Sequence, residues 1–234
     1  MFRIITAAAA AGALTLGASL GAAPAFADDA PKPTAHSSLA QIQQAGATQT
    51  AKRITSLTSA ITRVNSNTSL TASDRSTVLG TLNADVAGMT SLQAKIAADT
   101  AASTAWTDYR SIFTEYRVYA VALPQSYEAA AADRLTGAAI PKLQSAHDRL
   151  ASNLAANPGK WTSAMQTQLS DMQSKIDDAK TRSTGLAARA LAVTPAGYNA
   201  DHTLISNIRT DLRTALADCK AAAQDGRALV QALK

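Results

Sequence analysis

Cysteine is almost absent from this chain. Cys219 is the only one in 234 residues, so no disulfide can form within the chain. Its place on an apolar helical seam predicts a small, buried side chain rather than a reactive thiol. We therefore expect the fold to rely on packing alone.

Blocks of like charge are also missing. Lysine and arginine together number 22 against 17 acidic residues, and they are spread singly along the chain. This dispersal argues against a nucleic-acid partner. It leaves room for a mild attraction to an anionic cell-wall polymer or membrane surface, although an ordinary solvated surface is the simpler interpretation.

Strand patterns and clustered metal ligands are likewise missing. No alternating β-branched run is bounded by turn residues. His36, His147 and His202 are isolated, because none lies three or four positions from another histidine or cysteine. Neither a glycine-rich phosphate loop nor a strained nucleophile turn occurs. We expect no sheet, no metal site and no cofactor.

Long apolar runs occur only at the N-terminus. Arg3 precedes the uncharged stretch 4–20, and Ala25-Phe26-Ala27 supplies a small-x-small cleavage pattern. These features predict a secretory signal peptide over 1–27. A membrane anchor is the alternative, because the run is about long enough to span a bilayer. We expect a product that is secreted or associated with the cell wall, with no membrane span after cleavage.

Beyond a flexible lead-in at 28–37, apolar residues recur every three or four positions, which predicts an all-α fold. A sustained heptad seam keeps one stripe of each helix against a partner at a low crossing angle. The clearest seam is Met165, Leu169, Met172, Ile176, Ala179, Ser183, Leu186, Ala190 and Val193.

Turn residues between these seams set the expected helix boundaries. They predict an elongated antiparallel bundle of coiled-coil-like hairpins, about 45 Å long at 1.5 Å per residue. Pro124 and Pro141 predict kinks or breaks. Within 38–234 we expect an N-terminal hairpin plus an aromatic helix (38–123) and a C-terminal three-helix part (126–234). The expected helices cover 38–66, 71–100, 103–123, 126–156, 160–193 and 200–233.

Aromatic residues are few, and most lie in one segment. After the leader the chain keeps eight, and six of these fall between Trp106 and Tyr127. On a continuous helix they form one stripe, for which a packed core is the first interpretation. The alternative is a contact surface, because aromatic side chains dominate binding as well as core energetics.

Charges beside this stripe support the second interpretation. Arg110 and Arg117 are seven residues apart, and so are Asp108 and Glu115. None of the four has an opposite charge three or four residues away, so each needs a partner from another helix or from a ligand. Inter-helix pairs are the simpler answer. The candidate binding patch is Tyr109, Arg110, Glu115, Tyr116, Arg117 and Tyr119.

Three functions follow from these patterns. The first is a non-catalytic binding or structural module that presents the patch to a cell-wall polymer or an envelope protein; self-association is a further option. The second is an all-α secreted enzyme in which Glu115 works with Arg110 and Arg117 to stabilise an anionic transition state. The third is a passive helical spacer.

One stretch carries a resemblance. Residues 116–125 read Tyr-Arg-Val-Tyr-Ala-Val-Ala-Leu-Pro-Gln. This wording resembles a group of uncharacterised secreted helical proteins of high-GC Gram-positive (actinobacterial) bacteria. The resemblance implies an exported helical protein of the envelope or the medium, and it implies no activity or site residues.

Overall fold

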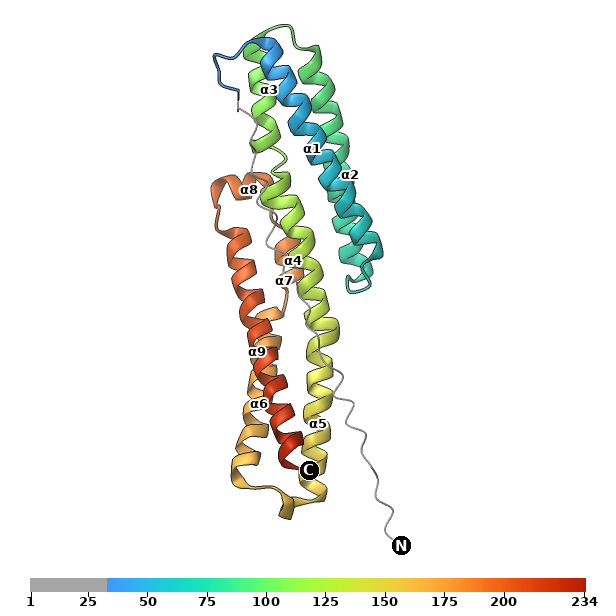
Figure 1. Cartoon of the computed structure of the whole chain (residues 1–234), viewed down its shortest axis with the longest axis vertical. Coiled ribbons are helices and arrows are strands. Elements are labelled where there is room, and N and C mark those ends of the chain that lie inside the picture. The colour runs from blue at the N-terminus through green and yellow to red at the C-terminus, as the bar shows by residue number, and fades with distance from the viewer. Residues whose placement is uncertain (1–32) are drawn as a thin grey trace.

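The computed structural model describes residues 33–234, which form helices joined by turns (Figure 1). The all-α prediction is confirmed, since no strand occurs within this range. The expected signal peptide and the first half of the lead-in (28–32) lie outside the described residues. The α-helices are α1 (Leu39–Ser66), α2 (Ala72–Ala98), α3 (Ala102–Thr114), α4 (Leu123–Arg134), α5 (Ile140–Ala156), α6 (Ser163–Ser183), α7 (Leu186–Leu191), α8 (Pro195–Ala200) and α9 (Leu204–Ala232).

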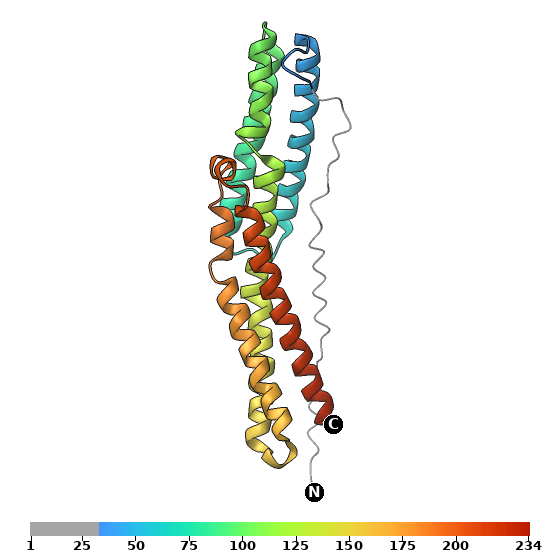
Figure 2. The ribbon, with the colours of Figure 1, turned by 90° about the vertical axis from the view of Figure 1, so that its left-hand side faces the viewer.

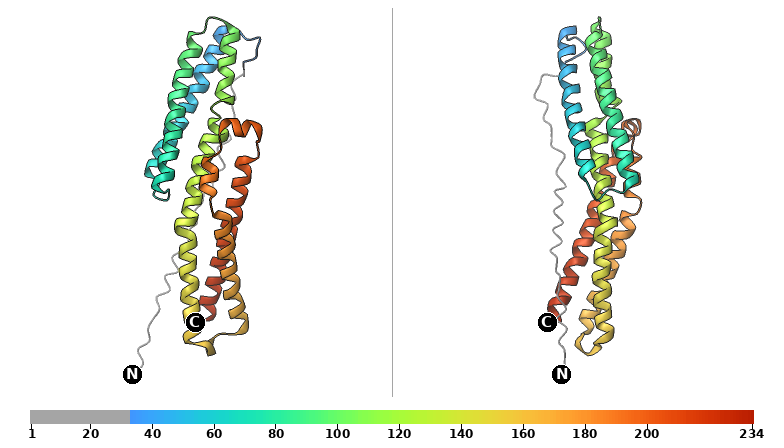
Figure 3. Two further views of the ribbon diagram at one scale, coloured as in Figure 1. Left: turned by 180° about the vertical axis from the view of Figure 1, so that it is seen from behind. Right: turned by 90° about the vertical axis from the view of Figure 1, so that its right-hand side faces the viewer.

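A central rod made of α3, α4 and α5 runs the length of the molecule. The α1–α2 hairpin packs along its upper half, and α6 and α9 pack along its lower half on the opposite side (Figures 1 and 3). The short helices α7 and α8 lie at mid-height, where the two halves meet (Figure 2). The two bundles are therefore joined nearly end to end. The continuous part of the rod, 118–156, alone spans roughly 55 Å at 1.5 Å per residue, so the expected length of 45 Å was too short.

Two hydrophobic clusters follow this division. The upper cluster joins α1, α2 and α3 and includes Ile42, Leu57 and Met89. The lower cluster joins α5, α6 and α9 and includes Met172 and Leu212. Cys219 belongs to the lower cluster, as predicted, and burial raises the pKa of its thiol to about 11. Such a thiol stays protonated and unreactive at neutral pH.

Side-chain caps define several helix starts. The Ser38 hydroxyl accepts from the Gln41 backbone N–H at 3.3 Å, and the Gln41 side chain accepts from the Ser38 N–H at 2.9 Å. This is a complete capping box. Thr71 caps α2 by accepting from the Asp74 N–H at 3.1 Å, which is the start that the sequence predicted.

The prolines do not break the rod, so of the predicted kinks or breaks the breaks do not occur. Pro124 follows the π turn η1 (Val118–Ala122), and Pro141 follows the π turn η2 (Leu135–Ala139). Proline lacks an N–H and its ring clashes with the carbonyl four residues earlier. A π turn is one residue wider than an α turn, so we infer that it makes room for each ring. The helix then continues without interruption.

Breaks occur instead at sites that the periodicity did not predict. The expected helix 103–123 ends at Thr114. The expected helix 160–193 is interrupted at Gly185, whose φ of 72° lies in the left-handed region. The segment that we predicted to be the turn before the last helix contains α8. Heptad seams record which side of a helix is buried, but a one-residue break can leave that pattern nearly intact.

Candidate functional site

The aromatic stripe of α3 lies mainly in the core of the upper bundle. The ring of Tyr109 stacks on Trp106 with centroids 5.6 Å apart and meets the edge of Phe113 at 5.3 Å. Only 5% of Tyr109 is exposed, and the neighbouring Ile112 is fully buried. Tyr109 therefore cannot contribute to an open surface patch, and the core interpretation of the stripe is confirmed at this residue.

The arginine that uses these rings is Arg53, from α1. Its guanidinium lies between the rings of Phe113 and Tyr119, at 4.6 and 4.8 Å from their centroids. It also donates to the carbonyl and the side-chain oxygen of Gln49, at 3.1 and 2.5 Å. With only 5% exposure, Arg53 is a desolvated cation held by aromatic faces. The sequence reasoning missed it because its partners lie about 60 residues away.

The segment between α3 and η1 is the sharpest local feature of the rod. Arg117 has φ 48° and ψ 37°, a left-handed conformation that costs a non-glycine residue roughly 1–2 kcal/mol. Asn199 of α8 holds this break. Its side-chain oxygen accepts from Arg117 Nε at 2.7 Å, and its amide donates to the Thr114 carbonyl at the end of α3 at 2.8 Å. The guanidinium also lies over the Tyr198 ring at 5.5 Å.

This break separates the two arginines of the predicted patch. Their spacing of seven residues places them on one face only if the helix is continuous, and it is not. Arg110 and Glu115 are exposed, and neither side chain forms a hydrogen bond or ion pair within residues 33–234. Arg117 is engaged by α8. The expectation of a shared arginine face is therefore wrong.

Tyr116 and Tyr119 turn toward the α1–α2 hairpin. The Tyr119 hydroxyl lies 3.3 Å from the Ser56 hydroxyl. Tyr116 lies directly over Gly88 of α2, so close that a Cβ there would come within 2.3 Å of the ring. Burial, then the charges of Glu115 and Asp85, raise the pKa of the Tyr116 hydroxyl. Both tyrosines are half-buried, so the structure divides the predicted patch between core, inter-helix contacts and solvent.

Asp85 lies beside Tyr116 on α2. Burial raises the pKa of its carboxyl to about 6, because a low-dielectric environment disfavours the charged form. Asp108, on α3, is also buried but has a basic partner. It accepts from Lys95 of α2 at 2.8 Å, and this bond raises the pKa of Lys95. The partner that Asp108 required does come from another helix, as the simpler interpretation predicted.

Buried polar residues on α4 form the site that sequence reasoning missed. Gln125, Glu128 and Asp133 are each at least 94% buried, with exposures of 6%, 3% and 6%. The Gln125 amide donates to carbonyls at the end of α7 and just beyond it, those of Ala190, Leu191 and Val193, at 2.5–3.3 Å. It therefore satisfies carbonyls that a helix end leaves without partners.

The other two connect α4 to the remaining elements. Arg209 of α9 donates to Glu128 at 2.8 Å, and the second oxygen of that carboxylate forms no hydrogen bond within residues 33–234. Asp133 accepts from the Thr71 N–H at the start of α2, at 2.8 Å, and burial raises the pKa of its carboxyl. One helix thus fixes α2 of the upper bundle and α7 and α9 of the lower part.

The only hint of this junction in the sequence is the alanine run 129–132. Small residues allow close approach from several sides, and α4 is enclosed by both bundles. Polar residues in such a run normally predict a solvated face. Their burial follows from the overlap of two hairpins on one helix, which periodicity within a single helix cannot reveal.

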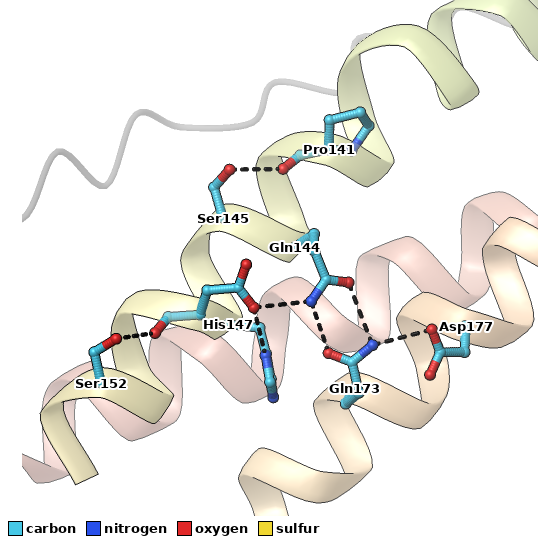
Figure 4. A network of polar contacts seen from close by, with 8 residues as sticks. Pro141, Gln144, Ser145, His147, Ser152, Gln173 and Asp177 are labelled. Carbon is cyan, nitrogen blue, oxygen red and sulfur yellow. Dashed lines mark hydrogen bonds and ion pairs between the residues drawn. The ribbon is translucent and has the colours of Figure 1, made fainter. Parts of the chain in front are cut away.

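A second polar network joins α5 to α6 (Figure 4). Gln144 and Gln173 exchange amide hydrogen bonds of 2.9 and 3.2 Å. Each amide also donates to an acid on its own helix, Asp148 or Asp177. The Gln144 bond, and then His147, lower the pKa of Asp148. His147 is therefore a packing and hydrogen-bonding residue here, and the network fixes which flank of α5 faces α6.

Metal ligands do not converge within residues 33–234, where no group of three or more His, Cys, Asp or Glu side chains could hold an ion. None of the helices in this part of the chain combines the length and the apolar character that crossing a bilayer requires. No protein-family model matches the chain, and no curated protein or solved structure matches it either. The resemblance to secreted actinobacterial helical proteins stays a prediction.

Proposed function

We propose that the protein is an exported, non-catalytic rod that serves as a structural and binding module at the cell envelope or outside the cell. The observation that carries this proposal is the buried polar junction on α4. Gln125, Glu128 and Asp133 connect one helix to both bundles. Because the α4 side chain in each of these bonds is buried, breaking one leaves that polar group without a partner and out of water. The junction therefore favours one fixed arrangement of the two bundles.

The enzyme alternative receives less support from the geometry. It requires Glu115, Arg110 and Arg117 to surround one substrate. Arg117 is held by Asn199. Because the helix is broken between Arg110 and Arg117, the two side chains do not share one helix face. Glu115 is exposed and therefore lacks the water-excluding surroundings in which charge stabilisation is strongest. A passive spacer is compatible with the same rod and differs only in having no partner.

Rigidity of the junction can be tested by a distance measurement across it. Thr62 of α1 and Ser174 of α6 are exposed and lie in different bundles. Spin labels at Thr62→Cys and Ser174→Cys, with Cys219→Ala as background, should give one narrow distance distribution by double electron–electron resonance. Adding Gln125→Ala and Glu128→Ala should broaden it.

The matched control is Gln144→Ala with Gln173→Ala. It removes a polar pair of the same kind inside the lower bundle, so the distribution should stay narrow. A broad distribution in the parent protein would contradict the rigid rod.

Export has its own test. The protein recovered from the culture medium or cell wall of the producing organism should begin at Asp28, one residue after the predicted cleavage pattern. Recovery of an intact N-terminus in the membrane fraction would favour the anchor alternative.

A further inference from the structure

Basic residues recur at heptad spacing along the outer surface of α9. Arg213, Lys220, Arg227 and Lys234 follow one another at intervals of seven residues, and all four are exposed. At 1.5 Å per residue, the three residues that lie on α9 are about 10 Å apart and span about 20 Å, and Lys234 follows the end of the helix. None of these side chains forms an ion pair or hydrogen bond within the described part of the chain.

The acids of α9 form a second heptad row, and every one of them is paired. Each lies opposite a base on α6 or α7, and those bases are also seven residues apart. The pairs are Asp211 with Arg189 (2.8 Å), Asp218 with Arg182 (3.3 Å) and Asp225 with Lys175 (2.5 Å). The negative charge of α9 is therefore neutralised on the side that faces α6.

The helix geometry places the two rows on opposite sides. The first three basic residues of the row each follow an acid by two positions, for example Lys220 after Asp218. Two residues correspond to a rotation of about 200° on an α-helix. Since the acids point to α6, the bases point away from it.

A shorter basic row on α5 joins this side. Lys142 and Arg149 are seven residues apart, exposed, and unpaired within residues 33–234. Lys142 precedes Gln144 by two positions, and Gln144 faces α6, so Lys142 also points away from α6. Because α5 packs against α9, the two rows border one surface. We call this surface the basic face: Lys142, Arg149, Arg213, Lys220, Arg227 and Lys234.

Acidic residues of the lower bundle lie elsewhere. Asp148 and Asp177 are bonded to the amides of the α5–α6 network, and the remaining acids of α6 project from that helix. The α5–α9 side therefore carries unpaired bases, whereas α6 carries acids together with Lys175, Lys180 and Arg182. Dispersed charges in the sequence hid this separation, because the ordering appears only when three helices are placed side by side.

The composition of the basic face restricts its partner. Tyr127 of α4 is the one large hydrophobic residue that is exposed within residues 33–234, so the basic face has no exposed aromatic or large apolar side chain, and the large apolar residues of α9 are at least half-buried against the core. Membrane-surface helices insert such residues into the bilayer, and single-stranded nucleic acids are bound by stacking on aromatic rings. A straight row of separated cations with none of these groups fits a flexible linear polyanion instead.

We propose that the basic face binds an extended phosphodiester polymer with a polyol backbone, the chemistry of an anionic envelope polymer. This inference deepens the binding role of the proposed function and rests on it. Lysine and arginine would neutralise successive phosphates, and release of the condensed counterions would supply much of the affinity. Binding should therefore weaken steeply as salt is raised.

The test uses purified protein and poly(glycerol phosphate), with binding measured by fluorescence anisotropy over a range of salt concentrations. The test variant is Arg213→Gln, Lys220→Gln and Arg227→Gln, which keeps good helix formers on the surface. We expect roughly 100-fold weaker binding at moderate salt and a logarithmic salt slope reduced by about two.

The control variant removes the same charge elsewhere, with Arg110→Gln, Lys160→Gln and Lys180→Gln. It should bind within about twofold of the parent, since a specific row and not net charge is responsible. Circular dichroism and thermal melting should be unchanged in both variants, which separates lost binding from lost folding.

Three results would overturn the inference: no binding by the parent protein, equal losses in the two variants, or tighter binding to duplex DNA or to anionic lipid vesicles than to the polymer. Each leaves the distance measurement across the α4 junction untouched, so failure of the basic face and failure of the rod can be told apart.

Discussion

The two bundles of this rod treat charge in opposite ways. The upper bundle places charged groups inside its packing, with Arg53 between two aromatic rings and Asp108 almost fully buried. Below its junction with α4, the lower bundle has an apolar core and arranges charge in rows along the outside of its seams. The aromatic residues of α3 therefore serve packing in the upper bundle, while the alanine-rich helix α9 carries the charged rows on the surface of the lower bundle.

Removal of Arg53 should produce the largest effect on this comparison. Arg53→Ala removes both cation–π contacts and leaves the Gln49 side-chain oxygen without this donor. We expect a loss of about 3 kcal/mol in the free energy of unfolding. Arg53→Lys keeps the charge but not the planar stacking and should lose less than the alanine variant.

The two tryptophans allow each bundle to be followed separately. Trp106 packs against the upper core and Trp161 is buried in the lower one. Urea unfolding of the Trp161→Phe protein then reports the upper bundle, and that of Trp106→Phe reports the lower. A cost below about 1 kcal/mol for Arg53→Ala at Trp106 would mean that the buried charge contributes little.

Gly88 tests the packing of Tyr116 at the next level of magnitude. Gly88→Ala places a Cβ 2.3 Å from the Tyr116 ring, and displacing the ring should cost about 2 kcal/mol. Gly80→Ala is the matched control on the same helix, because nothing lies within 4 Å of its Cβ. That change should stabilise the protein by up to about 1 kcal/mol through helix propensity. Equal changes in stability at the two positions would mean that the Tyr116 ring does not pack on Gly88.

Asp85 should make the upper bundle sensitive to pH. Its folded-state pKa is raised to about 6, so the folded protein favours the protonated carboxyl. The resulting stability is fully present below the unfolded pKa near 4 and is lost as pH rises through about 6. Asp85→Asn should therefore stabilise the protein at pH 7 by about 1 kcal/mol, a value reduced because the side chain is only half-buried. The gain should vanish near pH 4.

The control for this pH dependence is Asp178→Asn, an exposed carboxyl on α6. Because α6 lies in the other bundle, this change should leave the pH dependence of unfolding followed at Trp106 as it is in the parent protein. A stability gain from Asp85→Asn that grows toward low pH would mean that folding lowers the pKa of Asp85 instead of raising it.

Most of the fold was predictable because packing repeats along each helix. The seam from Met165 through Ile176 is buried as predicted, and α1 and α2 begin and end within two residues of expectation. The errors arose where one residue decides the path. Arg117 adopts a left-handed conformation held by Asn199, and the π turns before Pro124 and Pro141 depend on hydrogen bonding that residue type alone does not specify.

The candidate site was predicted less well for a related reason. Local spacing identified the aromatic residues but not Arg53, which reaches Phe113 from another helix. It did not single out Glu128, which pairs with Arg209 from α9. The charged rows of α9 were not recognised from the sequence, because only the partners on α6 and α7 show that the acids are paired and the bases are not.

The smallest predicted effect tests the lower half of the comparison. Asp218 and Arg182 are 25% and 49% exposed, and their atoms are 3.3 Å apart without a hydrogen bond. Solvent screening and side-chain entropy should limit their coupling to about 0.5 kcal/mol in a double-mutant cycle of Arg182→Ala and Asp218→Asn, followed at Trp161. The shorter and less exposed Lys175–Asp225 pair should couple more strongly, up to about 1 kcal/mol. Coupling above about 2 kcal/mol for Arg182 and Asp218 would mean that the outer rows stabilise the lower bundle as buried charge stabilises the upper one. The basic face would then be a by-product of folding, not a surface kept free for a partner.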